Sequence, residues 1–291
     1  KLPAAEITLF DARPADKDVS GDPRTLALAL GSVQQLRRLG AWPAAATRSV
    51  TPIAEVLVSQ APPSFDLRGA PAELRLRAAD EGVEMLGAVL RYGTLVSALQ
   101  QAWQAAERAA PQRLHGRFGQ PVADVRNLGA DQGGGVEVDA GIAERFDLAV
   151  VAEGGVFADQ ARKSIAHDYG QTAWVGTATL AGATPGLAVE RFTRQGPLAL
   201  LPLAPADDGQ ARAALVWCVA SADDPVAALS DVQRIAVLNT LLPAAAGTVV
   251  GLSPLKQFPL GLNAERTLTD GAIVRIGNAA QTLHPVAGQG L

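Results

Sequence analysis

Residues 272–291 of the chain read AIVRIGNAAQTLHPVAGQGL, and this stretch decides the fold. The apolar residues Ile273, Val274 and Ile276 predict a short buried strand that runs into a turn of small residues at 277–280. A proline corner follows, and then a Gly-Gln-Gly turn that is typical of a helix start. Glycines there let the backbone approach a ligand closely, and the free N–H groups suit an electron-rich oxygen. The pattern therefore predicts a strand–turn–helix unit that holds a ligand.

The same stretch resembles the flavin-contacting motif G-D-A-A-H…P…G-Q-G of the p-hydroxybenzoate-hydroxylase-like flavoprotein monooxygenases. The resemblance implies that Asn278, which stands where most members have aspartate, holds the ribityl chain of FAD. Asparagine keeps a hydrogen-bonding oxygen but loses the charge. It also implies that Pro285 borders the flavin and that the amides of Gly288, Gln289 and Gly290 contact its pyrimidine edge. A buried strand with a glycine turn and a proline stop is the structural alternative.

The variant string GNAAQTLHPVAGQG is most similar to the ubiquinone-biosynthesis branch of that family, the 2-octaprenyl-6-methoxyphenol hydroxylases. The strings ERFTRQGPLA at 190–199 and LVWC at 215–218 resemble the same branch. The resemblance therefore covers nearly the whole chain, with its motifs in the family's order.

Length and composition narrow the class of protein. A chain of 291 residues allows one large domain or two intertwined ones, and 48% hydrophobic residues with a mean hydropathy of +0.14 are typical of a globular protein. The net charge of −4 does not indicate a protein that binds nucleic acid or an acidic membrane surface. Cys218 is the only cysteine, which excludes an intrachain disulfide and fits a reducing cytosol. The three histidines are dispersed, so we expect no metal site.

The first strand of the chain ends in a carboxylate. Residues 6–11, EITLFD, predict a short strand ending at Asp11. A carboxylate at the end of the second strand of a dinucleotide-binding unit commonly binds the ribose hydroxyls. A turn-forming aspartate is an equally good interpretation of these residues alone.

A helix is expected after this strand, because Asp22 and Pro23 are start signals and Gly40 is a stop signal. The string DPRTLALALGSVQQLRRLGAW resembles the second signature helix of the same monooxygenases. The resemblance implies that Arg24 reaches towards the flavin and its pyrophosphate. An exposed arginine at a helix start is the alternative.

Two further segments carry predicted cofactor contacts. Residues 120–128 and 135–138 predict an antiparallel meander, and Val125 stands where family members touch the adenine with backbone atoms. Residues 146–155, FDLAVVAEGG, resemble the family's A-D-G fingerprint for flavin and reduced nicotinamide, with Glu153 in place of aspartate before Gly154. A strand followed by a tight turn is the alternative for the second segment.

The hydrophobic period changes along the chain and predicts two interleaved domains. Apolar runs with helices at 1–47, 84–166 and 261–291 predict a Rossmann-like FAD-binding layer, incomplete in this chain. Alternation at 48–83 and 167–260 predicts a mainly antiparallel β-sheet that forms the substrate domain. The fold class expected is thus mixed α/β. We expect strands at residues 50–58, 72–77, 173–180, 188–193, 198–203 and 213–219. We expect helices at residues 94–106 and 226–240.

No Ser-His-acid set, paired carboxylates or Cys-His pair stands at a convincing spacing, so we assign no catalytic side chain. The resemblance implies that FAD carries the chemistry, with NAD(P)H as reductant. The expected enzyme is a monooxygenase that inserts one atom of O₂ into a polyprenylated phenol of ubiquinone biosynthesis. A hydroxylase of a non-prenylated phenol and a flavin-free structural subunit of the biosynthetic assembly are the alternatives.

The expected partners are a lipophilic phenol and O₂, without nucleic acid. The first residues do not read as a signal peptide, and no apolar run is long enough to span a bilayer. We therefore expect a cytoplasmic protein. We also expect that it associates peripherally with the inner face of the membrane or with a ubiquinone-biosynthesis complex.

The family's first strand and G-x-G-x-x-G turn have no counterpart in these residues, nor do its C-terminal helices. That glycine turn receives the pyrophosphate of the cofactor. We therefore expect this chain by itself to be found without FAD and to be inactive, while Asp11, Arg24, Asn278 and Gly288 line a groove of the right shape.

Overall fold

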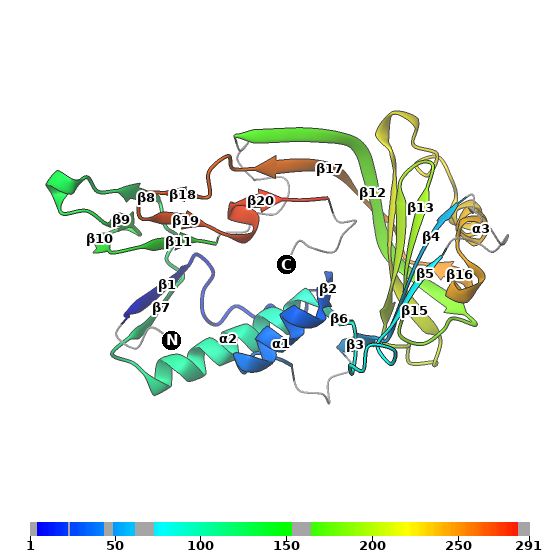
Figure 1. Cartoon of the computed structure of the whole chain (residues 1–291), viewed down its shortest axis with the longest axis horizontal. Coiled ribbons are helices and arrows are strands. Elements are labelled where there is room, and N and C mark those ends of the chain that lie inside the picture. Colours follow the sequence, from blue (N-terminus) through cyan, green and yellow to red (C-terminus); the bar gives the residue numbers. More distant parts are fainter. Residues whose placement is uncertain (1–4, 23, 44–48, 62–72, 153–163, 285–291) are drawn as a thin grey trace.

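A large, mostly antiparallel β-sheet and a group of smaller sheets with two helices make up the chain (Figure 1). The computed structural model describes residues 5–22, 24–43, 49–61, 73–152 and 164–284. The mixed α/β fold predicted from the sequence is confirmed, with many strands and few helices. No helix in these ranges is both long and apolar enough to cross a membrane.

The large sheet has the strand order β20-β17-β12-β15-β14-β13-β4-β5, with β16 pairing to β12. Its strands are antiparallel to their neighbours except for the parallel pair β4 and β13. The strands predicted from residue 173 to residue 219 are confirmed as parts of β12 to β15. The bounds are β4 Glu55–Ala61, β5 Leu74–Arg77, β12 Ile165–Ala181, β13 Leu187–Thr193, β14 Pro197–Leu203, β15 Ala211–Ala220, β16 Thr248–Leu252, β17 Lys256–Ala264 and β20 Gln281–Thr282.

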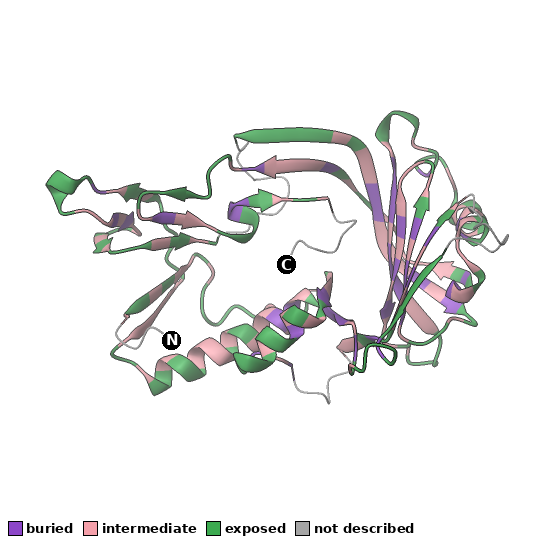
Figure 2. Cartoon of the chain, viewed as in Figure 1, coloured by how far each residue is buried: buried purple, intermediate pink, exposed green. Residues whose placement is uncertain are grey.

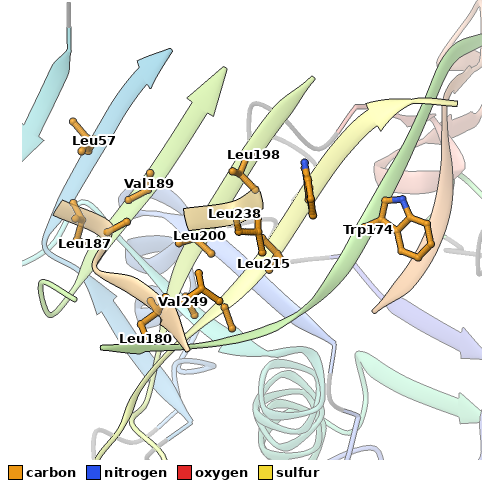
Figure 3. Close-up of a cluster of buried hydrophobic side chains, with 14 of the residues drawn as sticks. Leu57, Trp174, Leu180, Leu187, Val189, Leu198, Leu200, Leu215, Leu238 and Val249 are labelled. Atoms are coloured by element: carbon orange, nitrogen blue, oxygen red, sulfur yellow. The ribbon is translucent and has the colours of Figure 1, made fainter. Parts of the chain in front are cut away.

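One face of this sheet forms the main hydrophobic core with helix α3 (Asp231–Leu241) and strand β16 (Figure 3). Apolar side chains of neighbouring strands meet there in register, as Val189 of β13 does with Leu200 of β14. Leu215 and Leu238 are fully buried in the same cluster. Because successive side chains of a strand point to opposite faces, the intervening residues form a second face that is turned away from α3.

The smaller sheets and two helices lie on the side of the large sheet away from α3 (Figure 1). Strands β2, β6 and β3 form one sheet in that order, and β8, β9 and β10 form an antiparallel meander. The predicted meander is therefore confirmed. The bounds are β2 Thr25–Ala29, α1 Leu30–Arg38, β3 Val50–Ile53, β6 Gly87–Arg91, α2 Tyr92–Ala109, β8 Asp124–Asn127, η1 Ala130–Gln132, β9 Val136–Asp139 and β10 Ala143–Phe146.

Two parallel strand pairs complete this side. Strand β1 (Ile7–Asp11) pairs with β7 (Leu114–Phe118), and β11 (Ala149–Val151) pairs with β19 (Ile273–Arg275). Strand β18 (Thr269–Asp270) joins the second pair in antiparallel direction. The strands predicted to end at Asp11 and to include Ile273 are thus confirmed. The remaining short helices are η2 Ser221–Asp223, η3 Ala244–Ala246 and η4 Gly277–Ala279.

Three predicted boundaries are wrong. The helix expected from residue 22 starts only at Leu30, because Thr25–Ala29 pairs along its whole length with β6 and becomes strand β2. The single strand expected at 50–58 breaks at Ala54, whose N–H donates to Gly186 O (2.9 Å), so that β3 and β4 belong to different sheets. Tertiary pairing overrides local propensity in both cases.

The third wrong boundary is the start of the helix expected at 226–240. It begins at Asp231, because Ser230 and Gln233 form a capping box there. Asp224 Oδ1 accepts the N–H of Val226 (2.8 Å) and holds the preceding residues in a turn. Helix α2, by contrast, covers the predicted residues 94–106.

The buried face of the large sheet should dominate the stability of the chain. Leu215 is 0% exposed and Leu74, on edge strand β5, is 56% exposed. We predict that Leu215→Ala lowers the free energy of unfolding by about 2–5 kcal/mol, because the change removes buried methyl groups and leaves a cavity. The control Leu74→Ala should cost less than about 1 kcal/mol. Chemical denaturation of both variants measures the difference, and equal losses would contradict the assignment of the core.

Candidate functional site

The carboxyl ends of the two parallel strand pairs define the candidate site. Phe10 of β1 packs in the same hydrophobic cluster as Ala149 and Val151 of β11 and Ile273 of β19, so the two pairs lie against a common core. In open α/β sheets, ligands bind outside the carboxyl ends of parallel strands. Asp11 is the last residue of β1, and the turn with Asn278 follows β19.

Asp11 is half-buried, and its carboxylate accepts two bonds from Arg13. The backbone N–H of Arg13 donates to Oδ1 (2.8 Å) and its Nη2 donates to Oδ2 (3.0 Å). Two carboxylate oxygens offer about four lone-pair directions, so each keeps capacity for one more donor. This carboxylate can therefore accept the hydroxyls of a ribose while Arg13 holds it in place.

Arg24 lies directly before strand β2 at the surface. Its guanidinium forms an ion pair with Asp22 (Nη2–Oδ2 2.8 Å) and lies 4.0 Å from the centre of the Tyr92 ring. The hydrogen bonds from Arg24 hold the pKa of the Asp22 carboxyl below its usual range. An exposed ion pair of this kind is weak, so the guanidinium can exchange its partner for a phosphate at small cost.

The loop after β1 is pressed onto the start of helix α2, next to Arg24. A side chain at Gly93 would collide with the carbonyl oxygens of Val19 and Ser20, so only glycine permits this close approach. The N–H of Tyr92 donates to Arg24 O (2.7 Å). The backbone therefore fixes Arg24 at the point where the loop, β2 and α2 meet.

The turn after β19 is open on the side of Asn278. The N–H of Ile276 donates to Val151 O (3.0 Å), which continues the parallel pairing up to the turn. Gly277 has φ +56°, a left-handed conformation that favours glycine, and Asn278 is exposed while Ala279 and Ala280 are buried. The exposed asparagine amide can therefore bond a hydroxyl group of a ligand.

Val125 is half-buried in β8 and packs in the same cluster as Phe10. Its N–H donates to the Asp124 carboxylate (2.9 Å). The other predicted contacts, at Glu153, Gly154, Pro285, Gly288, Gln289 and Gly290, lie outside the described residues.

These groups match the chemistry of a flavin dinucleotide. A carboxylate with remaining lone pairs suits ribose hydroxyls, a guanidinium suits a pyrophosphate, and an exposed amide suits a ribityl hydroxyl. Within the described ranges, no group of three His, Cys, Asp or Glu side chains could hold a metal ion.

His284, which the family resemblance places with Pro285 beside the flavin and to which we assign no proton-transfer role, connects the turn to the large sheet. Its Nε2 lies 2.9 Å from Gln171 Oε1 on β12, and its ring makes an edge contact with Tyr169 (5.3 Å between centroids). Burial lowers the pKa of this imidazole below its usual range. His284, two residues after strand β20, is thereby held against β12.

Glu190 is the functional candidate that sequence reasoning missed. It lies in the middle of β13, and its Oε1 is buried without a hydrogen-bond partner among the described residues. Burial raises the pKa of this carboxyl to about 7. The signal available in the sequence was a single acid inside the apolar strand LAVERF, which alternation alone predicts to be solvent-facing.

Known proteins resemble this chain in sequence and in structure. No known family model matches the sequence. The ubiquinone hydroxylase UbiL of Rhodospirillum rubrum is 36% identical over 124 residues, which are 42% of this chain and 28% of that protein. The match therefore spans less than a third of the relative's own length.

Solved structures of similar fold include PqsL of P. aeruginosa in complex with 2-aminobenzoylacetate (TM-score 0.65, 16% identity, 98% of this chain and 75% of that one). They also include p-nitrophenol 4-monooxygenase PnpA from Pseudomonas putida (TM-score 0.61, 14% identity, 99% and 70%). A ternary complex of aklavinone-11 hydroxylase with FAD and aklavinone has a TM-score of 0.53 at 16% identity, over 98% and 54% of the two chains. The resemblance inferred from the motifs is confirmed.

The raised pKa of Glu190 predicts a pH-dependent stability. An ordinary glutamate titrates near about 4.3, so the folded state holds its proton more tightly than the unfolded state between that pH and about 7. As the pH rises through this window, the free energy of unfolding should fall by about 1–3 kcal/mol and then stay level. The fall is smaller than the full pKa difference would give, because the carboxyl keeps some contact with solvent.

Glu190→Gln should remove this fall, whereas the exposed control Glu81→Gln should retain it. Urea unfolding at about pH 5 and about pH 8 measures the difference for each protein. An unchanged slope in Glu190→Gln would show that another group titrates in this window.

Proposed function

We propose that this chain, which resembles the p-hydroxybenzoate-hydroxylase-like flavoprotein monooxygenases in sequence and in fold, is part of an FAD-dependent aromatic hydroxylase. The observation that carries the proposal is the position of Asp11 and of the Asn278 turn at the carboxyl ends of two parallel strand pairs that share one core. The family resemblance of the turn sequence supports the same cofactor.

Each described residue has one task in this proposal. Asp11 binds the ribose hydroxyls of FAD, Arg24 neutralises the pyrophosphate, and Asn278 bonds the ribityl chain. The backbone of Val125 lies beside the adenine. When bound, FAD supplies oxygen-transfer chemistry, with NAD(P)H as reductant and O₂ as the oxygen source. The remaining predicted contacts, from Glu153 to Gly290, belong to the same proposal.

The two-domain division also remains part of the proposal. Residues 1–47, 84–166 and 261–291 would bind FAD, and residues 48–83 and 167–260 would hold the substrate. The cofactor supplies the chemistry, so the protein has two tasks of its own. It orients an electron-rich ring, and it excludes water from that ring. The face of the large sheet turned away from α3 suits this task because it is largely apolar.

The finer proposal is that the substrate is a polyprenylated phenol of ubiquinone biosynthesis. The name of the Rhodospirillum rubrum relative supports it, as do the strings shared with that branch. A groove of about 360 Å³ lies at the end of the large sheet and is lined by the apolar residues Val58, Leu74 and Phe192 and by the polar residues Ser59, Gln60 and Glu73. In this proposal a prenyl tail lies against the apolar part of the groove. A location in the cytoplasm with peripheral contact to the membrane fits such a substrate.

The test of the proposed function uses the full gene product. We expect a visible flavin absorbance spectrum after purification or after addition of FAD, and consumption of O₂ and NAD(P)H that yields a hydroxylated phenol. A full gene product that binds no FAD would favour the alternative, a flavin-free structural subunit. Equal turnover of prenylated and short phenols would favour a hydroxylase of non-prenylated phenols.

The cofactor assignment of Asn278 gives the next prediction. Asn278→Ala removes a neutral hydrogen bond, which contributes about 0.5–1.5 kcal/mol, so it should weaken FAD binding by about tenfold or less. Fluorescence titration of the full protein with FAD measures the dissociation constant, with the exposed Gln257→Ala as control. An unchanged constant would remove Asn278 from the site.

The substrate assignment predicts a selective effect of Phe192, which is 45% exposed in the groove. Phe192→Ser should raise KM about tenfold for a prenylated phenol, since a contact of about 1.4 kcal/mol with the tail is lost, and should leave KM of a short phenol unchanged. Leu268→Ser is the control, because Leu268 has nearly the same exposure, 46%, outside the groove. Equal effects on both phenols would place the tail elsewhere.

A further inference from the structure

Glu190 lies on the face of the large sheet that is turned away from helix α3. Its neighbours Leu187 and Val189 belong to the core under α3, whereas Ala188 belongs to the cluster formed with strands β3 and β6. Side chains alternate along a strand, so Glu190 shares the face of Ala188. This is the face that the proposed function gives to the substrate.

No cation neutralises this carboxyl within the described part of the chain. The next residue, Arg191, points to the opposite face and donates from Nε to Leu241 O at the C-terminal end of helix α3 (3.0 Å). Glu190 stands in register between Val58 of β4 and Ala199 of β14, neither of which carries a polar side chain.

The titratable groups facing Glu190 are few. The residues of β4 and β14 that share its face are Val56, Val58, Gln60, Pro197, Ala199, Leu201 and Leu203, and none of them titrates. On β5 this face carries Leu74 and Leu76, and on β6 of the adjoining sheet the cluster member is Val89. Cys218 of β15 is the titratable neighbour, because burial and then the charge of Glu190 raise the pKa of its thiol to about 12.

The face of Glu190 continues to the stretch that resembles the flavin motif. Cys218 packs in a cluster with Ala173, Leu260 and Tyr169, and the ring of Tyr169 contacts His284. A ligand lying on this face between His284 and Glu190 would touch mainly apolar side chains, the Tyr169 ring and a single carboxyl group, that of Glu190. That environment fits an aromatic ring with a single polar substituent.

We propose that Glu190 accepts the proton of the substrate's phenolic hydroxyl. This inference rests on the proposed function. In the step, the phenolic O–H bond breaks, a new O–H bond forms at a Glu190 carboxylate oxygen, and the electron pair stays on the phenolic oxygen. The resulting phenolate makes the ring more electron-rich, which is what attack on an electrophilic oxygen requires.

Burial and chemistry agree with this role. A buried carboxyl oxygen without a hydrogen bond costs stability, and in a native structure it calls for a functional explanation. A hydroxyl donor from the substrate would satisfy Oε1. Burial raises the pKa of the carboxyl to about 7, and a general base is most effective when its pKa lies near the working pH.

The experiment compares Glu190→Gln, Glu190→Asp and the control Glu81→Gln in the full protein. The first measurement is the ultraviolet difference spectrum of a bound phenol, recorded with and without FAD, which reports phenolate formation independently of turnover. The second is kcat and KM against pH for two substrates, an ordinary phenol and one whose hydroxyl is already ionised at the assay pH.

We expect the wild-type protein and Glu81→Gln to show the phenolate band and Glu190→Gln to lose it. For the ordinary phenol, kcat of Glu190→Gln should fall by about 10²–10⁴-fold, with a smaller change in KM. The ionised phenol should restore most of this loss. Glu190→Asp keeps a carboxylate and should retain the band with a reduced kcat. If Glu190→Gln does not fold, this second variant still tests whether a carboxylate at position 190 forms the phenolate.

Three results would overturn the inference: no phenolate band in the wild-type protein, a band retained in Glu190→Gln, or no rescue by the ionised phenol. Failure of the proposed function has a different signature. In that case the full protein binds no FAD and consumes no O₂, whatever residue stands at position 190.

Discussion

Strand β12 runs for 17 residues and pairs with β15, β16 and β17, so most of the large sheet depends on its pleat. Trp174 and Ala178 face the core under α3, while Ala173 and Val175 face the other way. Since the side-chain period of a strand is two, a slip by one residue would exchange the two faces completely. The buried core therefore fixes which side chains lie on the face turned away from α3.

The same strand connects the two parts of the molecule. Near Gly170 its pairing with β17 shifts register, and Tyr169 and Gln171 on either side contact His284. In Figure 1 β12 and β17 extend together from the large sheet towards β18 and β20. The backbone pairing of β12 with β17 and of β17 with β20 thus reaches from the large sheet to the residues that follow the Asn278 turn. Figure 2 shows buried residues concentrated in the large sheet and in scattered positions of the smaller ones.

Much of the fold could be predicted from the sequence, because strong local patterns agree with the tertiary structure. The strands from β12 to β15 and helix α2 follow simple hydrophobic periods. Thr25–Ala29 could not be predicted as a strand, since Leu26 also fits a helix face with Leu30, Val33 and Leu36, and only pairing with β6 decides between the two structures. The break at Ala54 depends on a bond to Gly186, which stands far along the chain, so no local window contains its cause.

The candidate site divides in the same way. Asp11 and Asn278 could be found because each stands at the end of a recognisable apolar strand, and the structure places both at carboxyl ends of parallel pairs. Glu190 could not, because alternation along the strand predicts that a single acid, followed here by Arg191, faces solvent. The pleat sends the two side chains to opposite faces, where Arg191 bonds a backbone carbonyl and Glu190 is left with an apolar surrounding. A carboxyl acquires unusual chemistry here because the sheet separates it from the cation next to it, and that separation follows from the alternation that also builds the core.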